Sequence, residues 1–191
     1  MAATQFLCFG EYLLYKSSGS YSINSCEVIE VFYDIRTDLD KLKYAANITK
    51  IINDVTTENQ NTYRVLQLYL NTLYVISKTD KNLKLINSIF RLRLMSQIGF
   101  RPVIDECKSC KTREDLNYFS FKDNGLKCES CGKLDKGAIK ITPTTKDAIK
   151  YIILADSKKI YSFDIPGESI KELEIISKIY LEDKLEKKYE I

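Results

Sequence analysis

The chain has 191 residues, of which 45% are hydrophobic and 29% charged, and its formal net charge is +3. This length and composition suffice for one or two small globular domains. The chain contains no histidine, and the absence of the commonest general base and nucleophile activator argues against hydrolase and protease functions.

The sequence has no run of about 18 apolar residues that would cross a membrane. Its N-terminus also lacks a basic start followed by an apolar signal core. We therefore expect a cytoplasmic protein without a membrane partner, in a compartment where thiols stay reduced and paired cysteines indicate a metal site rather than disulfides.

The first element is predicted as a β-hairpin. The stretches 12–15 and 21–23 are rich in tyrosine and branched residues and flank a serine and glycine turn at 17–20, while residues 28–32 predict a further extended piece. Two or three strands do not make a stable β domain. We expect this meander either to pack on the elements that follow or to be part of a larger β-barrel.

From Thr37 the apolar period changes from 2 to 3.6, which predicts helices. The first helix is capped by Thr37 and ends in the polar stretch 56–61, and the second covers about 61–78. The third covers about 82–98 and ends at Gly99, which can adopt the left-handed conformation after a helix.

The C-terminal region predicts a short strand at 139–141 and two further helices. Thr142, with a proline after it, is a cap for a short helix. Ser169 and Glu172 have the spacing of a capping box, which predicts a last helix to about residue 188.

Four cysteines form the strongest motif. Cys107 and Cys110 enclose two residues, Cys128 and Cys131 also enclose two, and 17 residues separate the pairs. One Cys-x2-Cys turn supplies two thiolates, and a second completes the tetrahedron that Zn²⁺ prefers. We predict one structural zinc ion, because four thiolates leave no open position for catalysis.

The segment between the cysteine pairs predicts a hairpin that returns the second pair to the first. Residues 118–121 have the pattern of a strand, and the Asp-Asn-Gly sequence at 123–125 offers positive-φ residues for a turn. The segment has few apolar side chains, so we expect the metal to hold it together. The alternatives are free cysteines in a core or a redox-active Cys-x2-Cys pair.

Basic residues gather between positions 78 and 113, where nine stand against three acidic residues. Such a segment is either a solvated helix face or a footprint for phosphates or an acidic peptide. The candidates for contact with DNA or a partner protein are Lys81, Lys84, Arg91, Arg93, Arg101, Lys108, Lys111 and Arg113.

The order of these motifs resembles the RecO family of bacterial recombination mediators. The stretch FRLRLMSQIGFRP at 90–102 is followed by the first cysteine pair, then by Tyr-Phe-Ser at 118–120, Gly-Leu at 125–126 and the second pair. Residues 32–45 resemble the first helix of that family's helical domain. The likeness covers about residues 6–191.

The resemblance implies a mainly α fold with a small β part. Residues 1–33 would be a partial OB-fold remnant, a β-meander, because a family member would begin with a complete barrel and only its last strands are recognisable here. Residues 34–191 would be a C-terminal helical bundle domain. A four-cysteine zinc ribbon module at about 103–136 would be inserted in it, with Cys107, Cys110, Cys128 and Cys131 as metal ligands.

The resemblance also implies a non-enzymatic, cytoplasmic, nucleoid-associated protein of DNA damage repair and recombination. Such a protein binds single- and double-stranded DNA, anneals complementary strands, and acts with RecR to replace single-strand-binding protein by RecA at gaps. It holds the acidic, apolar C-terminal tail of single-strand-binding protein on the helical domain. Arg91 and Arg93 are candidates for gripping the carboxylate of that tail.

The cysteine pairs alone leave other functions open. A zinc-ribbon interaction module of the transcription or translation machinery would carry the same motif. A thiol–disulfide oxidoreductase would use the same four cysteines without a metal. Bound zinc with no free thiols at these positions would exclude the oxidoreductase.

Overall fold

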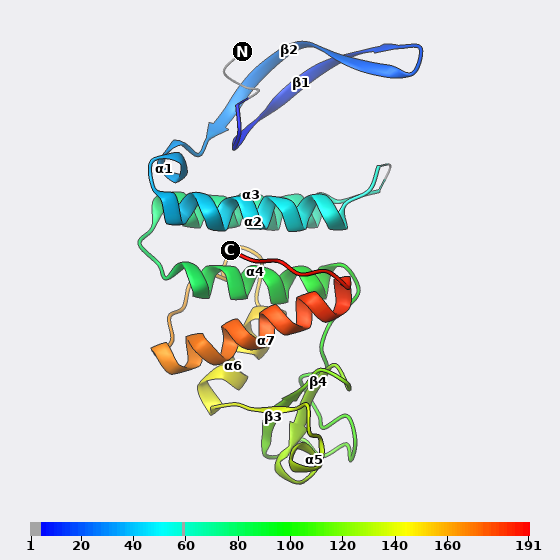
Figure 1. Ribbon diagram of the computed structural model, residues 1–191, viewed down its shortest axis with the longest axis vertical. Coiled ribbons are helices and arrows are strands. Elements are labelled where there is room, and N and C mark those ends of the chain that lie inside the picture. Colours follow the sequence, from blue (N-terminus) through cyan, green and yellow to red (C-terminus); the bar gives the residue numbers. More distant parts are fainter. Residues whose placement is uncertain (1–4, 59) are drawn as a thin grey trace.

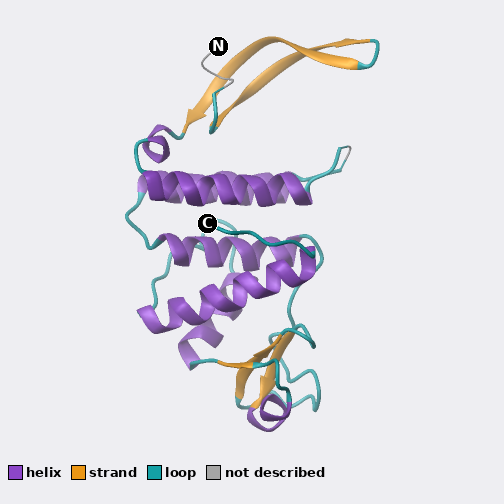
Figure 2. Cartoon of the chain, in the orientation of Figure 1, coloured by secondary structure: helices purple, strands orange, loops and turns teal. Residues whose placement is uncertain are grey.

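The computed structural model describes residues 5–58 and 60–191. Residues 1–4, in the predicted β-meander, and residue 59, in the predicted break between helices, lie outside the described residues. A long hairpin stands at one end of the molecule, helices form the middle, and a small sheet lies at the other end (Figure 1). Figure 2 shows that helix predominates and that the strands are confined to the two ends.

The hairpin consists of β1 (Cys8–Ser17) and β2 (Ser20–Val31), which pair antiparallel. Gly19 supplies a positive φ of 94° at the turn, as the hairpin prediction requires. The predicted further extended piece at 28–32 is confirmed up to Val31, where it continues β2. Two register shifts in the ladder allow this long ribbon to bend.

The base of the hairpin is attached to the helices. Leu7 and Phe32 are buried, and the Phe32 amide donates to the Leu7 carbonyl at 3.2 Å. The short helix α1 (Tyr33–Arg36) follows, and its Asp34 forms an ion pair of 2.7 Å with Lys78 of α3 (Tyr63–Lys78). Packing on the helices is therefore confirmed at this base, while membership of a larger barrel stays a prediction.

Helix α2 (Leu39–Val55) begins one residue later than predicted. Asp38, rather than Thr37, is its cap, because the Asp38 carboxylate accepts the amide protons of Asp40 and Lys41 at 2.9 and 3.0 Å. A carboxylate satisfies these orphan donors and also interacts favourably with the positive end of the helix.

Helix α4 (Leu83–Gln97) is the centre of the core. Apolar side chains from several directions around it are fully buried, and α4 packs against α2, α3, α6 (Pro143–Leu154) and α7 (Gly167–Leu185). It ends as predicted: Gly99 has a φ of 101°, and the Phe100 amide donates to the Met95 carbonyl at 2.8 Å, which closes the last turn.

The predicted capping box of α7 is wrong. The helix begins at Gly167 with no side-chain cap, and Glu172 instead accepts hydrogen bonds from the amide and hydroxyl of Thr142 at 3.0 and 2.9 Å. Thr142 is the predicted cap of α6 and is confirmed as such. Glu172 therefore ties α7 to the start of α6, where helix donors lack partners within the helix.

Helix α7 is also shorter than predicted. It ends at Leu185, because Glu186 adopts a left-handed conformation with a φ of 51°, and Tyr189 beyond it is buried. Its hydroxyl donates to Asp54 of α2 at 2.8 Å. Among the described residues, no helix combines the length and the apolar character that a membrane crossing requires.

The cysteine-bearing segment forms a three-stranded sheet in the order β4-β3-β5, made of β3 (Leu116–Ser120), β4 (Gly125–Cys128) and β5 (Ile139–Lys140). The predicted hairpin and the predicted short strand are confirmed. The predicted connector after Cys131 is wrong at its start, because α5 (Glu129–Leu134) extends through it.

This segment is not held by cysteines alone. Phe119 is fully buried and its ring lies edge-on to Tyr180 of α7 at 5.6 Å, and Ile104, Leu116 and Leu126 belong to the same core. The expectation that the segment lacks apolar packing is therefore wrong, because a few well-placed residues extend the helical core into it.

Gly125 is where the predicted turn differs from the structure. The positive φ of 54° belongs to Asn124, whereas Gly125 lies in β4 beside Val103. A Cβ at position 125 would be 2.3 Å from the Val103 carbonyl oxygen. Glycine is thus required by a close approach of two backbones.

We expect Gly125→Ala to lower the free energy of unfolding by about 1–3 kcal/mol, as for other overpacked sites. Chemical denaturation measures this change. Gly137→Ala is the matched control, because the nearest atom to its added Cβ is 3.7 Å away. Equal stability of the two variants would contradict the close approach.

Candidate metal centre and basic surface

The four predicted cysteines meet in one place. Cys107 and Cys110 lie in a turn before β3, Cys128 ends β4, and Cys131 lies in α5. Their sulfur atoms all lie within 4.8 Å of one another, and the Cys110 and Cys128 sulfurs are 3.6 Å apart. Sulfurs bound tetrahedrally to zinc at about 2.3 Å are about 3.8 Å apart, so the cluster has the size of a zinc site.

The backbone around each pair explains this convergence. The Cys107 amide donates to Thr112 and the Lys111 amide to Cys107, at 2.7 and 2.9 Å, and Lys111 has a positive φ of 66°. In the second turn Gly132 allows close packing, since a Cβ there would be 2.2 Å from the Tyr118 ring. Local backbone hydrogen bonds and a close glycine contact therefore help to shape both turns.

The electrostatics favour a cation among the sulfurs. Burial raises the pKa of Cys107, but backbone amides of Cys110, Cys128 and Ser109 stabilise its thiolate and bring the pKa down to about 6. Hydrogen bonds with Cys128 and Cys110 raise the pKa of Cys131 to about 12. One thiolate thus forms readily and opposes ionisation of its neighbours, and a divalent cation removes that opposition.

The cluster can hold one metal ion in a closed shell of four sulfurs, and zinc fits it. Cys107 and Cys128 are buried, Cys131 is half-buried, and Cys110 is exposed. Four cysteine ligands leave no coordination position for a water or a substrate, so the chemistry of this donor set is structural.

Four of the predicted basic contact residues lie at the surface within, before or just after the first cysteine turn. Lys108, Arg113 and Arg101 are exposed; Lys108 lies between Cys107 and Cys110, and Arg113 follows this pair. Lys111 pairs with Glu106 at 2.7 Å, and its side chain remains 62% exposed. Lys108, Arg113 and Arg101, which have no ion pair within residues 5–58 and 60–191, are therefore available to an anionic partner, as is the exposed side chain of Lys111.

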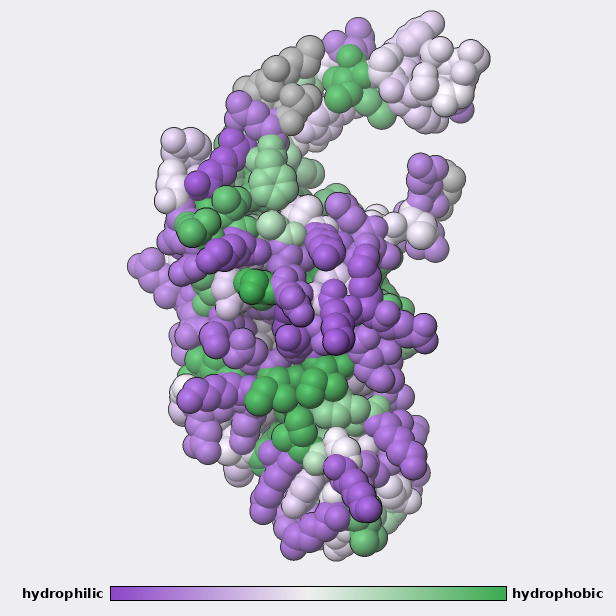
Figure 3. Space-filling view, viewed as in Figure 1, coloured by the Kyte–Doolittle hydropathy of each residue, from purple (hydrophilic) through white to green (hydrophobic). Residues whose placement is uncertain are grey.

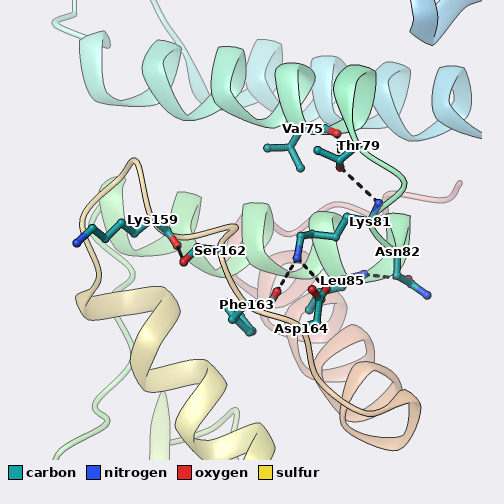
Figure 4. A network of polar contacts seen from close by, with 9 residues as sticks. All are labelled: Val75, Thr79, Lys81, Asn82, Leu85, Lys159, Ser162, Phe163 and Asp164. Atoms are coloured by element: carbon teal, nitrogen blue, oxygen red, sulfur yellow. Dashed lines mark hydrogen bonds and ion pairs between the residues drawn. The ribbon is translucent and has the colours of Figure 1, made fainter.

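Two predicted lysines connect helices. Lys81 donates to the Phe163 carbonyl at 2.8 Å and pairs with Asp164 at 2.7 Å, so it fastens the start of α4 to the connection between α6 and α7 (Figure 4). Its side chain is only 14% exposed. Lys84 pairs with Glu174 of α7 at 3.2 Å but stays about half exposed.

The two predicted tail-binding arginines serve α4 packing. Arg91 is buried between α4 and its neighbours, desolvation lowers its pKa, and its Nε atom has no hydrogen-bond partner. Arg93 donates to the carbonyls of Ile152 and Ile153 at 3.0 and 2.8 Å. It therefore satisfies the last turn of α6, whose carbonyls lack partners within the helix.

A cavity of about 420 Å³ brings together three arginines, two of which were predicted as contacts. Arg93 and Arg101 meet Arg64 of α3 there, and Tyr63 also lines the cavity. Arg64 was missed because it lies outside the basic segment 78–113. Only the folding of α3 alongside α4 places it there, and no signal in the sequence indicates it.

We expect the purified chain to contain one zinc ion and to lose it when Cys107→Ser removes one of four ligands. Elemental analysis measures the metal, and a chelator should lower the melting temperature of the wild-type chain. Cys26→Ser is the control and should retain zinc, since Cys26 lies in β2. A metal-free wild-type chain with four reactive thiols would contradict this site.

The chain was compared with known proteins. The family model for "Recombination protein O C terminal" matches residues 36–190. The DNA repair protein RecO of Acetivibrio thermocellus is 43% identical over 190 residues, covering 99% of this chain and 76% of that protein. The DNA repair protein RecO of Alkaliphilus metalliredigens is 30% identical over 182 residues, covering 95% of this chain and 74% of that protein.

A third relative, RecO of a Thermoanaerobacter species, is 29% identical over 175 residues, covering 92% of this chain and 71% of the relative. The names of these relatives denote DNA repair proteins. With matches over nearly the whole chain, this protein belongs to the RecO family of DNA repair proteins.

Proposed function

We propose that this chain is a non-enzymatic mediator of DNA repair and homologous recombination that works by binding. It binds single- and double-stranded DNA, RecR and the C-terminal tail of single-strand-binding protein. Through these contacts it promotes strand annealing and the loading of RecA at single-stranded gaps in the nucleoid. Membership of the RecO family supports the repair role.

The observation that carries the tail-binding part is an exposed face of α7. Lys171, Ile175, Lys178 and Ile179 have the spacing of one helix face, and all four are exposed. Ile175 and Ile179 are 49% and 41% exposed. Figure 3 shows hydrophobic surface over this side of the molecule, bordered by hydrophilic side chains.

This α7 face has the chemistry that an acidic, apolar tail needs. Branched side chains one turn apart offer apolar contact, and the lysines beside them complement carboxylates. Arg91 and Arg93 are less suited to the carboxylate, because the first is buried and the second already bonds two carbonyls. We therefore propose that the tail binds to the α7 face.

We expect a fluorescent peptide with the tail sequence to bind saturably, and Ile175→Ala with Ile179→Ala to weaken it at least about tenfold through lost apolar burial. Fluorescence anisotropy measures the affinity. Leu154→Ala is the matched control, because Leu154 is 60% exposed but lies on α6. An unchanged affinity of the double variant for the peptide would show that the tail does not bind to the α7 face.

For DNA we propose the exposed cations of the first cysteine turn, Lys108, Lys111 and Arg113, together with Arg101, which lines the cavity with Arg64 and Arg93. The four sulfurs and a zinc ion would fix the turn that carries the first three, so that metal binding and DNA binding are linked. Lysine and arginine contacts with phosphates release counterions, which makes the affinity depend on salt.

We expect the affinity for single-stranded DNA to fall with salt, with a logarithmic slope of about −0.7 for each neutralised phosphate. Lys108→Gln with Arg113→Gln should make this slope shallower by the equivalent of one or two phosphates. Lys188→Gln, at an exposed position near the C-terminus, should leave the slope unchanged. A salt-independent affinity would argue against phosphate contacts here.

We also propose that the β1–β2 hairpin, within residues 1–33, belongs to an OB-fold, and that residues 34–191 with the metal-binding module at 103–136 form the C-terminal domain. The hairpin supports this because apolar side chains such as Leu13, Tyr15 and Ile29 are more than half exposed along it. Two strands with such side chains need further strands or a partner surface for burial.

A further inference from the structure

The arginine cavity gathers positive charge from three separate places in the chain. Arg64 lies in the first turn of α3, Arg93 in α4, and Arg101 after the end of α4. Burial lowers the pKa of Arg93, the negative charge of Asp156 opposes this effect, and the positive charges of Arg101 and Arg64 lower the pKa further. Arg101 and Arg64 are therefore each close enough to repel Arg93.

Nothing in the described chain neutralises this charge by direct contact. Across residues 5–58 and 60–191, none of the three arginines has a carboxylate within the 4.0 Å of an ion pair. The Nε atom of Arg93 is also buried without a hydrogen-bond partner. Like charges gathered in a cavity destabilise the fold, and a bound anion relieves the repulsion.

The start of α3 adds to the attraction for an anion. Tyr63, Arg64 and Gln67 all line the cavity, so the N-terminal turn of this 16-residue helix forms one wall. Its cap residue Thr62 makes no side-chain capping bond. The Asn61 side-chain oxygen instead accepts the Tyr63 amide proton at 3.2 Å, so the positive end of the helix dipole, rather than that amide group, adds to the field of the arginines.

Tyr63 supplies a second kind of contact. Its side chain is 68% exposed although it forms part of the cavity wall. Exposed tyrosine rings beside bound phosphates offer a face on which a nucleobase stacks, a contact worth about 1–3 kcal/mol per base. The cavity thus combines a site for phosphate with a site for the adjoining base.

We propose that this cavity binds the phosphate monoester at the end of a DNA strand, with the ring of Tyr63 stacked on the terminal base. A terminal phosphate carries a charge near −2 and three acceptor oxygens, which suit the exposed guanidinium groups of Arg64 and Arg101 as direct donors. Arg93, which already donates to two carbonyls, adds positive charge beside them. A carboxylate or an internal phosphodiester has one negative charge and two such oxygens. This inference rests on the DNA binding proposed above and assigns one site to it.

The test compares short 3′-labelled single strands by fluorescence anisotropy. We expect a 5′-phosphorylated strand to bind about tenfold more tightly than a 5′-hydroxyl strand, a difference of about 1.4 kcal/mol. A 5′-hydroxyl strand one nucleotide longer controls for added charge, and should not reproduce the gain. Inorganic phosphate and a deoxynucleoside 5′-monophosphate serve as competitors.

The variants separate this cavity from general DNA contacts. Arg64→Gln with Arg101→Gln should abolish the preference, so that the phosphorylated and the hydroxyl strand bind with about equal affinity, because both residues line the cavity. Lys108→Gln with Arg113→Gln should weaken both strands and keep the preference. Tyr63→Ala should weaken both strands about fivefold through lost stacking, whereas Tyr63→Phe should not. Thermal melting checks that each variant is folded.

Equal affinity of the two strands for the wild-type chain would overturn the proposal while leaving DNA binding intact. A preference that survives Arg64→Gln with Arg101→Gln would also overturn it. If neither strand binds at low salt, the proposed DNA binding itself is contradicted, and the strand-end site is contradicted as well. Tight binding of inorganic phosphate with no gain from attached DNA would assign the cavity to the free ion.

Discussion

The burial of the middle of α4 is the constraint from which most of the structure follows. Residues 85–92 are all buried among α2, α3, α6 and α7, so each polar side chain in or beside this stretch needs a partner or carries a cost. Arg93 meets this need at the last carbonyls of α6. Arg91 meets it only in part, since Glu182 and Glu174 act on it from a distance.

The same core extends into the metal-binding segment and determines what a metal has to do there. Phe119 against Tyr180 anchors β3 to α7, and Glu172 fastens α7 to the beginning of α6 next to β5. The sheet is thus positioned by packing, and Cys107 and Cys128 themselves belong to the buried core. A zinc ion would therefore add the connection between the two cysteine turns to an attachment that packing already provides.

Local signals in the sequence predicted the elements well and the contacts between them poorly. Gly99 and Thr142 end and begin helices as expected, because a left-handed turn and an N-cap depend on one or two residues. The four cysteines were equally readable, since metal geometry limits their spacing. Glu172 shows the limit: its capping-box spacing is genuine, but the donors that it satisfies belong to another helix.

Arg64 shows that limit for the candidate sites. Its position on the cavity wall depends on how α3 packs along α4, and no short stretch of the sequence specifies that packing. The reverse holds for Arg91, whose place in a basic stretch suggested an exposed contact although the core encloses it. Charge in a sequence therefore predicts a surface only after the helix faces have been assigned.

The basic residues of the segment 78–113 consequently have different roles, which depend on the surroundings of each side chain in the fold rather than on its position in the sequence. Lys81 and Lys84 hold helices together, Arg91 is enclosed, and Arg93 has one guanidinium edge committed to α6. The exposed cations of this segment with no ion pair among the described residues, Arg101, Lys108 and Arg113, all follow α4, where the chain leaves the core. Because paired lysines contribute little field at a distance, the proposed DNA binding would depend on this small exposed subset, joined by Arg64.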